Sequence, residues 1–337
     1  MDRFPLGLNT YCLRAMRWPD QKLLEYTAGL KLDAVFLQDS VDPGTNDPGH
    51  WRDVKAQAAE LGLHLETGTG ASLPRTPDRF DASVKLLTDA IRRASAMGSP
   101  LVRTLIASDR AALPPGPVEQ HIETMIKLFR TVGPQAVDAG VKFALENHKD
   151  LLCWETRQVI DGAGKEFVGS YLDTGNPVFV MEDPMETLET LGPVAVTFHL
   201  RDSVVYESRN GIAVQWVPLG EGVVDFKRIV ARAKEILPPV YVYIKPITGR
   251  PPEILPTLDA DFWKRYADKK ASSFARFLAL AKNGHPYERD MVIEDVPGKS
   301  NRAEFLPALQ YQQREHMERS VEYGKKVLDL GLKWRNG

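Results

Sequence analysis

Two segments decide the fold of this chain: VKFALENHKD, residues 141–150, and FVGSYLDTGNP, residues 167–177. Each is an apolar, strand-like run that ends in a carboxylate, Glu146 in the first and Asp173 in the second. A parallel α/β sheet places the carboxyl ends of its strands along one rim and builds its site there. The pattern recurs in VAVTFHLRDS, where His199 ends the run. We therefore expect three consecutive strands to bring two carboxylates and one imidazole to the same rim.

Strand-like and helix-like segments alternate eight times along the 337 residues. Amphipathic helices are expected between the strands, for example at 80–97, and a final helix occupies much of 309–330. Eight repeats favour a closed (β/α)₈ TIM barrel over a doubly wound sheet, and residues 1–337 suit a single such domain. The expected strands span residues 6–11, 34–37, 63–68, 101–107, 141–146, 167–173, 194–200 and 240–244.

Two segments exceed a minimal barrel. Residues 204–217 place two β-rich runs around SRNG, which predicts a hairpin. Residues 250–262 form a proline-rich loop that leaves the last strand at the predicted rim. We expect both insertions to cover the substrate, because barrel active sites are built from such loops. For the hairpin, a solvated decoration is an equally good interpretation.

The composition excludes several classes of protein. Forty-three basic and forty-five acidic side chains give a net charge of -2, which provides no reason to expect a nucleic acid partner. Two cysteines, Cys12 and Cys153, favour a reducing compartment over a disulfide framework. Neither a signal peptide nor an apolar run of membrane-spanning length is apparent, so we expect a cytoplasmic protein without a membrane partner.

The three strand-end residues have the chemistry of a metal site. Oxygen and imidazole ligands without thiolate suit Mn²⁺, Mg²⁺, Co²⁺ or Zn²⁺, and the sequence does not choose among them. We therefore expect Glu146, Asp173 and His199 to hold one divalent metal ion. Taken singly, each carboxylate is equally explained as a helix cap or as an ion-pair partner.

Further polar residues fall at or near the same rim. His148, two residues beyond Glu146, is expected to face the substrate, with a surface histidine as the alternative. Guanidinium groups at strand ends suit a carboxylate or phosphate, although each taken alone is more often an ordinary ion-pair residue. Glu221 lies in a turn that two glycines allow to approach the rim. The expected substrate-binding residues are Arg103, Asn176, Arg201, Glu221 and Arg250.

The motifs ENHKD, YLDTGNP, FHLRDS and PLGEGVVDF together resemble the sugar phosphate isomerase/epimerase family of xylose isomerase-like TIM barrels. The likeness extends from the first strand to ERSVEYGKKVLDLGL near the end of the chain. It implies a metal held by Glu146, Asp173 and His199. It also implies a fourth ligand, a glutamate at the end of the eighth strand, where this sequence has Lys245 in YIKPITGR.

Lys245 is the informative departure. Isomerases and epimerases of this family move a proton with carboxylates on opposite sides of the substrate, and this chain lacks one of them. We expect Lys245 to donate to a developing enolate, with Schiff-base chemistry as a weaker alternative. Glu146 and His148 complete the expected catalytic set. An outward-facing Lys245 that pairs with a rim carboxylate is the structural alternative.

The resemblance and this departure together favour a lyase. We expect metal-dependent decarboxylation of a small 3-oxo sugar acid through an enolate, because the enolate then needs protonation on only one face. Sugar or sugar phosphate isomerisation or epimerisation is the alternative, and a non-catalytic sugar-binding relative is another. A nuclease resembling AP endonucleases fits poorly, because Asn176 stands where a zinc-binding histidine would follow. The expected partner is a sugar or sugar acid, and a homo-oligomer is possible.

Overall fold

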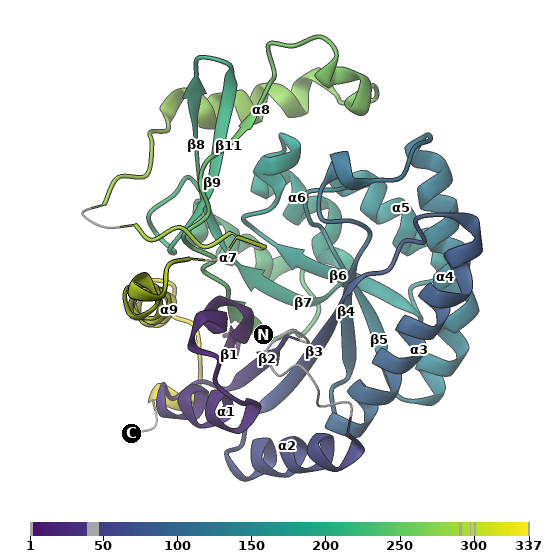
Figure 1. Ribbon diagram of the computed structural model, residues 1–337, viewed down its shortest axis with the longest axis vertical. Helices are drawn as coiled ribbons and strands as arrows, with labels where there is room; N and C mark the ends of the chain where they lie inside the picture. The colour runs from purple at the N-terminus through teal and green to yellow at the C-terminus, as the bar shows by residue number, and fades with distance from the viewer. Residues whose placement is uncertain (1–2, 39–46, 290–291, 297, 300, 336–337) are drawn as a thin grey trace.

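Eight parallel strands close into a barrel in the computed structural model, which describes residues 3–38, 47–289, 292–296, 298–299 and 301–335 (Figure 1). Their order around the barrel is β1-β10-β7-β6-β5-β4-β3-β2, so the last barrel strand pairs with the first. The predicted TIM barrel is confirmed. Its strands are β1 (Leu6–Asn9), β2 (Ala34–Leu37), β3 (His64–Ala71), β4 (Leu101–Leu105), β5 (Lys142–Glu146), β6 (Val168–Asp173), β7 (Ala195–Leu200) and β10 (Val242–Ile244).

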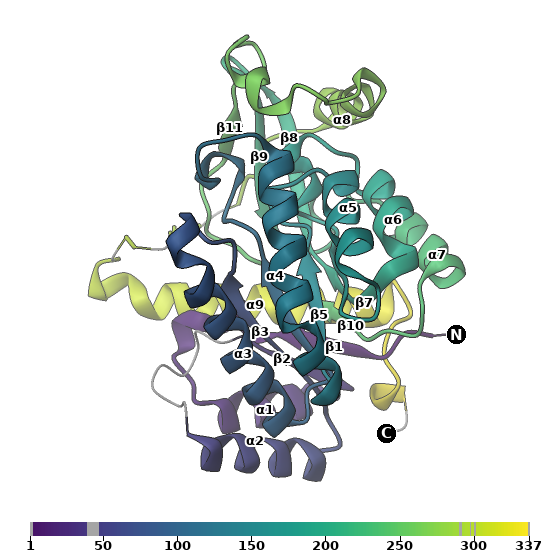
Figure 2. The ribbon, with the colours of Figure 1, turned by 90° about the vertical axis from the view of Figure 1, so that its right-hand side faces the viewer.

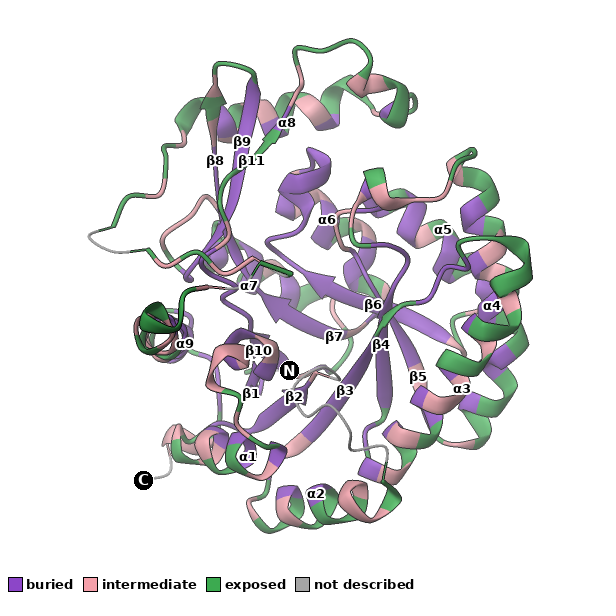
Figure 3. Cartoon of the chain, viewed as in Figure 1, coloured by how far each residue is buried: buried purple, intermediate pink, exposed green. Residues whose placement is uncertain are grey.

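The strands form the buried centre of the molecule (Figure 3). Both faces of each strand are covered, as parallel sheets require, so β1, β2, β4 and β6 are buried along their whole length. Inside the barrel, the rings of Phe36, Tyr171 and Tyr243 pack edge to face. Gly7 lies against this cluster, because an added Cβ there would come within 2.5 Å of the Ala34 carbonyl oxygen.

Helices surround the barrel (Figure 2). The predicted helix at 80–97 is α3, and its buried residues recur at helical spacing. No helix of the described ranges is long and apolar enough to cross a membrane. The helices are α1 (Asp20–Gly29), α2 (Pro48–Glu60), α3 (Phe80–Met97), α4 (Val118–Asp138), α5 (Cys153–Ala163), α6 (Pro184–Leu191), α7 (Phe226–Ile236), α8 (Ala271–Asn283) and α9 (Leu306–Lys326).

A second, three-stranded sheet stands on one rim of the barrel, beside α8 (Figures 1 and 2). The predicted hairpin forms β8 (Asp202–Ser208) and β9 (Gly211–Val217). The proline-rich segment is more ordered than the expected loop, because β11 (Glu253–Leu255) pairs antiparallel with β9.

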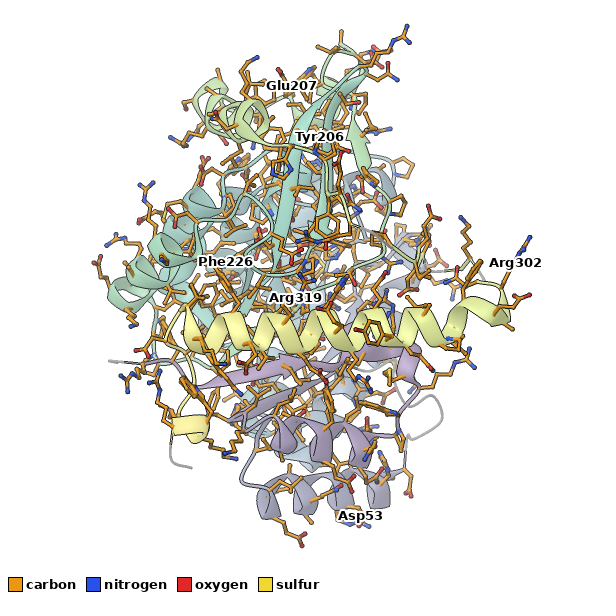
Figure 4. All side chains as sticks on the ribbon, turned by 90° about the vertical axis from the view of Figure 1, so that its left-hand side faces the viewer. Asp53, Tyr206, Glu207, Phe226, Arg302 and Arg319 are labelled. Atoms are coloured by element: carbon orange, nitrogen blue, oxygen red, sulfur yellow. The ribbon has the colours of Figure 1, made fainter. Side chains whose placement is uncertain are left out.

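Several element ends differ from the sequence-based expectation, among them the end of β1 and the start of α9. The first strand stops at Asn9 rather than continuing to residue 11, because the Asn9 side chain accepts from the Tyr11 amide and begins a 3₁₀ segment. The final helix, α9, begins at Leu306 and crosses the side of the barrel, where Figure 4 labels Arg319 on it.

Candidate active site

Glu146 and Asp173 end neighbouring strands and lie at the same rim, as predicted. Residue 146 is the last of β5 and residue 173 the last of β6, and both side chains are fully buried. Asn147 fixes the two strand ends, because its side chain donates to the Asp173 carbonyl (2.9 Å) and accepts from the Asp173 amide (2.8 Å). The two carboxylates are therefore held rigidly side by side.

Lys245 lies between these carboxylates rather than facing outward. It follows β10, and its Nζ is 2.8 Å from Glu146 Oε1 and 3.2 Å from Asp173 Oδ2. The side chain is 5% exposed, so water contributes little to its solvation. Burial and the charge of Arg201 lower the pKa of Lys245, whereas the two carboxylates act in the opposite direction.

Two arginines complete the charged cluster. Arg103, from β4, donates from Nε to Glu146 Oε2 and from Nη1 to the Thr69 carbonyl. Arg201 follows β7, and its Nη2 is 3.2 Å from Asp173 Oδ2. Burial disfavours the ionised form of Glu146, but the nearby positive charges of Arg103 and Lys245 hold its pKa well below the usual value.

Asn176 links Glu146 to Arg201 within the charged cluster. Its Nδ2 donates to Glu146 Oε1 (3.0 Å), and its Oδ1 accepts from Arg201 Nη1 (2.8 Å). Its backbone amide and that of Gly175 donate to Asp173 Oδ1. All four carboxylate oxygens of the pair thus accept from at least one described donor.

His199 is the register partner of Asp173 on β7, and its ring lies within the aromatic cluster. Its ring stacks on Tyr171 at 3.8 Å and on Tyr243 at 4.7 Å. Its Nε2 is 3.2 Å from Thr197 Oγ1, and its buried Nδ1 has no hydrogen-bond partner among the described residues. Burial and the nearby cations lower the pKa of His199, so the imidazole is neutral near pH 7.

A cavity of about 570 Å³ opens above the cluster. The predicted residues Arg103, His148, Arg201, Lys245 and Arg250 all line it. Both rim insertions contribute to its wall, through residues 215–216 of the hairpin and 250–253 of the proline-rich segment. Gln215 joins the two insertions by donating to the Arg250 carbonyl (2.8 Å). This volume is within the range of small-molecule sites.

His148 lines the cavity, and its expected contact with substrate stays a prediction. Its Nδ1 is 2.7 Å from the Ser108 carbonyl oxygen, which fixes the ring orientation. Burial, with the positive charges of Arg103 and Arg201, lowers the pKa of His148 to about 3 although Glu146 opposes the shift. The ring is therefore neutral near pH 7 and serves as a hydrogen-bonding group.

Glu221 lies elsewhere. The Asp202 carboxylate accepts from the amides of Gly220 and Gly222, both at 2.9 Å, and so fixes the turn. Glu221 pairs with Arg319 of α9, and it accepts from Tyr287 (2.8 Å). It does not line the cavity, so its predicted contact with substrate has no support in this geometry.

The wall residues that were absent from the sequence-based set include Lys149, Phe179 and Trp216. Lys149 Nζ lies 5.1 Å from the centre of the Phe179 ring. The guanidinium carbon of Arg201 lies 4.5 Å from the centre of the Trp216 ring. Lys149 follows His148 directly in the ENHKD motif, which is a usable signal. The hairpin sequence alone does not indicate that Trp216 points inward.

The charged cluster does not fit a divalent ion. The orphaned Nδ1 of His199 would suit a ligand atom, but no group of three or more His, Cys, Asp or Glu side chains within the described ranges is arranged to hold a metal. Lys245 and Arg201 occupy the space between the carboxylates. A divalent ion about 4 Å from one such cation would be repelled by roughly 8 kcal/mol at an effective dielectric constant of about 20, which cancels the attraction of one carboxylate at the same distance. Metal binding by Glu146, Asp173 and His199 stays a prediction.

Comparison with known proteins gives one family. The family model described as "Xylose isomerase-like TIM barrel" matches residues 24–240. Among curated proteins, 3-oxo-isoapionate decarboxylase of Pectobacterium atrosepticum is 24% identical over 230 residues, which cover 66% of this chain and 78% of that protein.

Solved structures share the fold. A D-psicose 3-epimerase determined in the presence of D-fructose has a TM-score of 0.63 at 15% identity, covering 96% of this chain and 99% of its own. A xylose isomerase-like TIM barrel protein from Mycobacterium smegmatis in complex with magnesium has a TM-score of 0.57 at 17% identity. The match covers 72% of this chain and 90% of that protein.

Proposed function

Because this chain belongs to the xylose isomerase-like TIM barrel family, we propose that it is a carbon–carbon lyase that decarboxylates a small 3-oxo sugar acid. The position of Lys245 carries the proposal: its Nζ is within hydrogen-bond distance of both buried carboxylates, at the base of the cavity. The similarity to a decarboxylase of another oxo-sugar acid supports the same reaction class.

The cavity suits an anionic substrate. Arg103, Arg201, Lys245, Lys149 and Arg250 all line it. Of these, Lys149 is already paired with Glu253, whereas Arg201 has a buried Nε without a hydrogen-bond partner among the described residues. A sugar acid would bring a carboxylate for a guanidinium fork and hydroxyl groups for the polar wall.

The reaction balances without an added oxidant or reductant. The bond between the carboxyl carbon and the carbon next to the ketone breaks, and carbon dioxide leaves. The bonding electrons pass into an enolate, whose oxygen accepts a hydrogen bond from Lys245. A proton from Lys245, restored from water, then moves to the enolate carbon and gives the ketone product.

Sugar epimerisation is the alternative, and the cluster geometry disfavours it. An epimerase needs a carboxylate base with a free oxygen, but Glu146 accepts from Lys245 and Asn176 on one oxygen and from Arg103 on the other. The carboxylate implied by the family resemblance at the eighth strand is replaced by an ammonium.

The test is a substrate panel. Purified protein is offered five- and six-carbon 3-oxo sugar acids and the corresponding ketoses, with and without Mn²⁺, while ¹³C NMR follows labelled carboxyl groups. We expect labelled carbon dioxide from at least one oxo acid and no epimerised ketose. Epimerised ketoses without carbon dioxide would instead assign the isomerase alternative, and saturable binding without turnover would assign a sugar-binding protein.

The variant Lys245→Met should lose carbon dioxide release in the same assay. Lys85→Met is the matched control, because Lys85 is an exposed lysine of α3 remote from the cavity wall.

A further inference from the structure

We propose that the Lys245 ammonium, assisted by Arg103 and Arg201, takes the role of the family's divalent cation, so that this site works without a metal ion. The claim that the ammonium acts in catalysis rests on the proposed function. Its central measurement is metal binding, which is independent of the substrate and reaction.

The first support is the position of the positive charge. Glu146 and Asp173 come from adjacent strands, and Lys245 comes from β10 on the far side of β7. The Nζ atom lies 2.8 Å from one carboxylate and 3.2 Å from the other. A metal shared by these two carboxylates would have to lie in the region that this nitrogen already fills.

The second support is the orientation of the carboxylate oxygens. An ionised carboxylate has about four lone-pair sites, and in this pair protein donors already occupy most of them. Glu146 Oε2 accepts from Arg103, and Asp173 Oδ2 accepts from Lys245 and lies 3.2 Å from Arg201 Nη2. Asp173 Oδ1 is occupied by the two amides of the following turn. The network orients both carboxylates toward protein donors.

The third support is the charge balance. Three cationic side chains, from Arg103, Arg201 and Lys245, surround two carboxylates, and all five are buried. Ordinary ionisation leaves one positive charge in excess, beside the cavity that all three cations line. A divalent ion would raise that excess to three. An enolate or carboxylate oxygen would cancel it, which suits stabilisation of a negative intermediate.

Metal titration of the apoprotein tests the inference directly. The purified protein is treated with chelator, dialysed and titrated with Mn²⁺ up to 1 mM, with free Mn²⁺ followed by electron paramagnetic resonance. We expect no stoichiometric site in the wild-type protein. One Mn²⁺ bound per chain and lost in Asp173→Asn would overturn the proposal, whichever reaction the protein catalyses.

Two variants at one position separate charge from ligation. Lys245→Glu removes the ammonium and adds the missing carboxylate, whereas Lys245→Gln removes only the charge. We expect Lys245→Glu to bind Mn²⁺ at least tenfold more tightly than Lys245→Gln and the wild-type protein. Equal affinities in all three proteins would contradict the claim that the ammonium stands in the metal position. Thermal melting and circular dichroism establish that each variant is folded before it is titrated.

The reaction provides a separate readout. With an accepted oxo acid, turnover by the wild-type protein should change by less than twofold after chelator treatment or Mn²⁺ addition. If chelation lowered the turnover more than twofold and Mn²⁺ restored it, metal independence would be overturned and the decarboxylase proposal would stand. Failure of every oxo acid would overturn the proposed function, while the titration would still decide whether the site binds metal.

Discussion

At the scale of single residues, Lys245 determines what the cluster can do. A buried carboxylate pair needs a positive partner, and this partner comes from the strand end that bears a glutamate in the family pattern. The exchange replaces a ligand and base with a hydrogen-bond donor. In our proposal, the sign of the charge at this position separates a site that binds metal from one that binds an anion directly.

The substitution Lys245→Met should lower kcat for carbon dioxide release about 100- to 1,000-fold, because one donor to the developing enolate is lost. Arg103 and Arg201 still pair with the two carboxylates, so the protein is expected to fold. Steady-state kinetics with an accepted oxo acid measures the effect, and near-ultraviolet circular dichroism checks the fold. An unchanged kcat would exclude a catalytic role for this lysine.

The substitution Arg201→Lys keeps the charge but loses the planar fork that contacts Asn176 and Asp173. We expect KM for the oxo acid to rise about 10- to 100-fold, as for the loss of a hydrogen bond to a charged group, with a smaller change in kcat. A fall in kcat at constant KM would instead place the guanidinium at the reacting centre rather than at the substrate carboxylate.

The sequence predicted much of the site because strand ends meet at one rim of a barrel. This rule brought together Glu146, Asp173, Arg103, Arg201 and Lys245, which are up to 142 residues apart. It cannot determine side-chain direction within a turn. Glu221 is therefore misplaced, because the Asp202 carboxylate holds its turn and Arg319 draws the side chain toward α9.

At the scale of elements, the predicted bounds match the structure for α3 and β2, whereas β11 and α8 were not predicted. Helix α3 spans the predicted residues, because its apolar stripe repeats over 18 residues. Strand β11 was expected as a loop, because it has only three residues and follows two prolines, and pairing with β9 supplies its order. Helix α8 has no counterpart among the expected elements, although Phe274 and Phe277 already have helical spacing.

Gly211 tests what holds the three-stranded sheet of β8, β9 and β11, here called the rim sheet, together. Its φ of 140° is unfavourable for other residues, and an added Cβ would lie 2.1 Å from the Leu255 carbonyl oxygen. Gly211→Ala should therefore separate β11 from β9, lower the free energy of unfolding by about 1–3 kcal/mol and raise KM through movement of the cavity wall. Hydrogen exchange at residues 253–255 measures the loosening.

The matched control is Gly29→Ala, because Gly29 ends helix α1 and an added Cβ there meets nothing within 4 Å. This variant should match the wild-type protein in KM and be equally stable or up to about 1 kcal/mol more stable, because alanine is favoured over glycine in a helix. If hydrogen exchange at residues 253–255 were unaltered in Gly211→Ala, the rim sheet would not depend on the close approach of residue 211 to the Leu255 carbonyl oxygen.

At the scale of the whole molecule, the charge balance of the chain conceals the charge of its cavity. The protein has a net charge of -2, yet the cavity wall includes Arg103, Lys149, Arg201, Lys245 and Arg250 against Asp109 and Glu253. The totals therefore give no reason to expect a polyanion partner, and they say nothing about a small anionic substrate. The cavity wall is thus more basic than the chain as a whole.

This charge separation predicts selective stabilisation by an inert sugar acid. A ligand that binds only the folded protein stabilises it by about 2.7 kcal/mol at a concentration of about 100 Kd. We expect a five- or six-carbon aldonate to raise the melting temperature by a few degrees at constant ionic strength, and the corresponding neutral alditol to leave it unchanged. The aldonate shift should disappear in Arg201→Met, since Arg201 lines the cavity and its buried Nε has no hydrogen-bond partner among the described residues. Equal shifts from acid and alditol would mean that the hydroxyl groups, rather than the carboxylate, determine what this cavity binds.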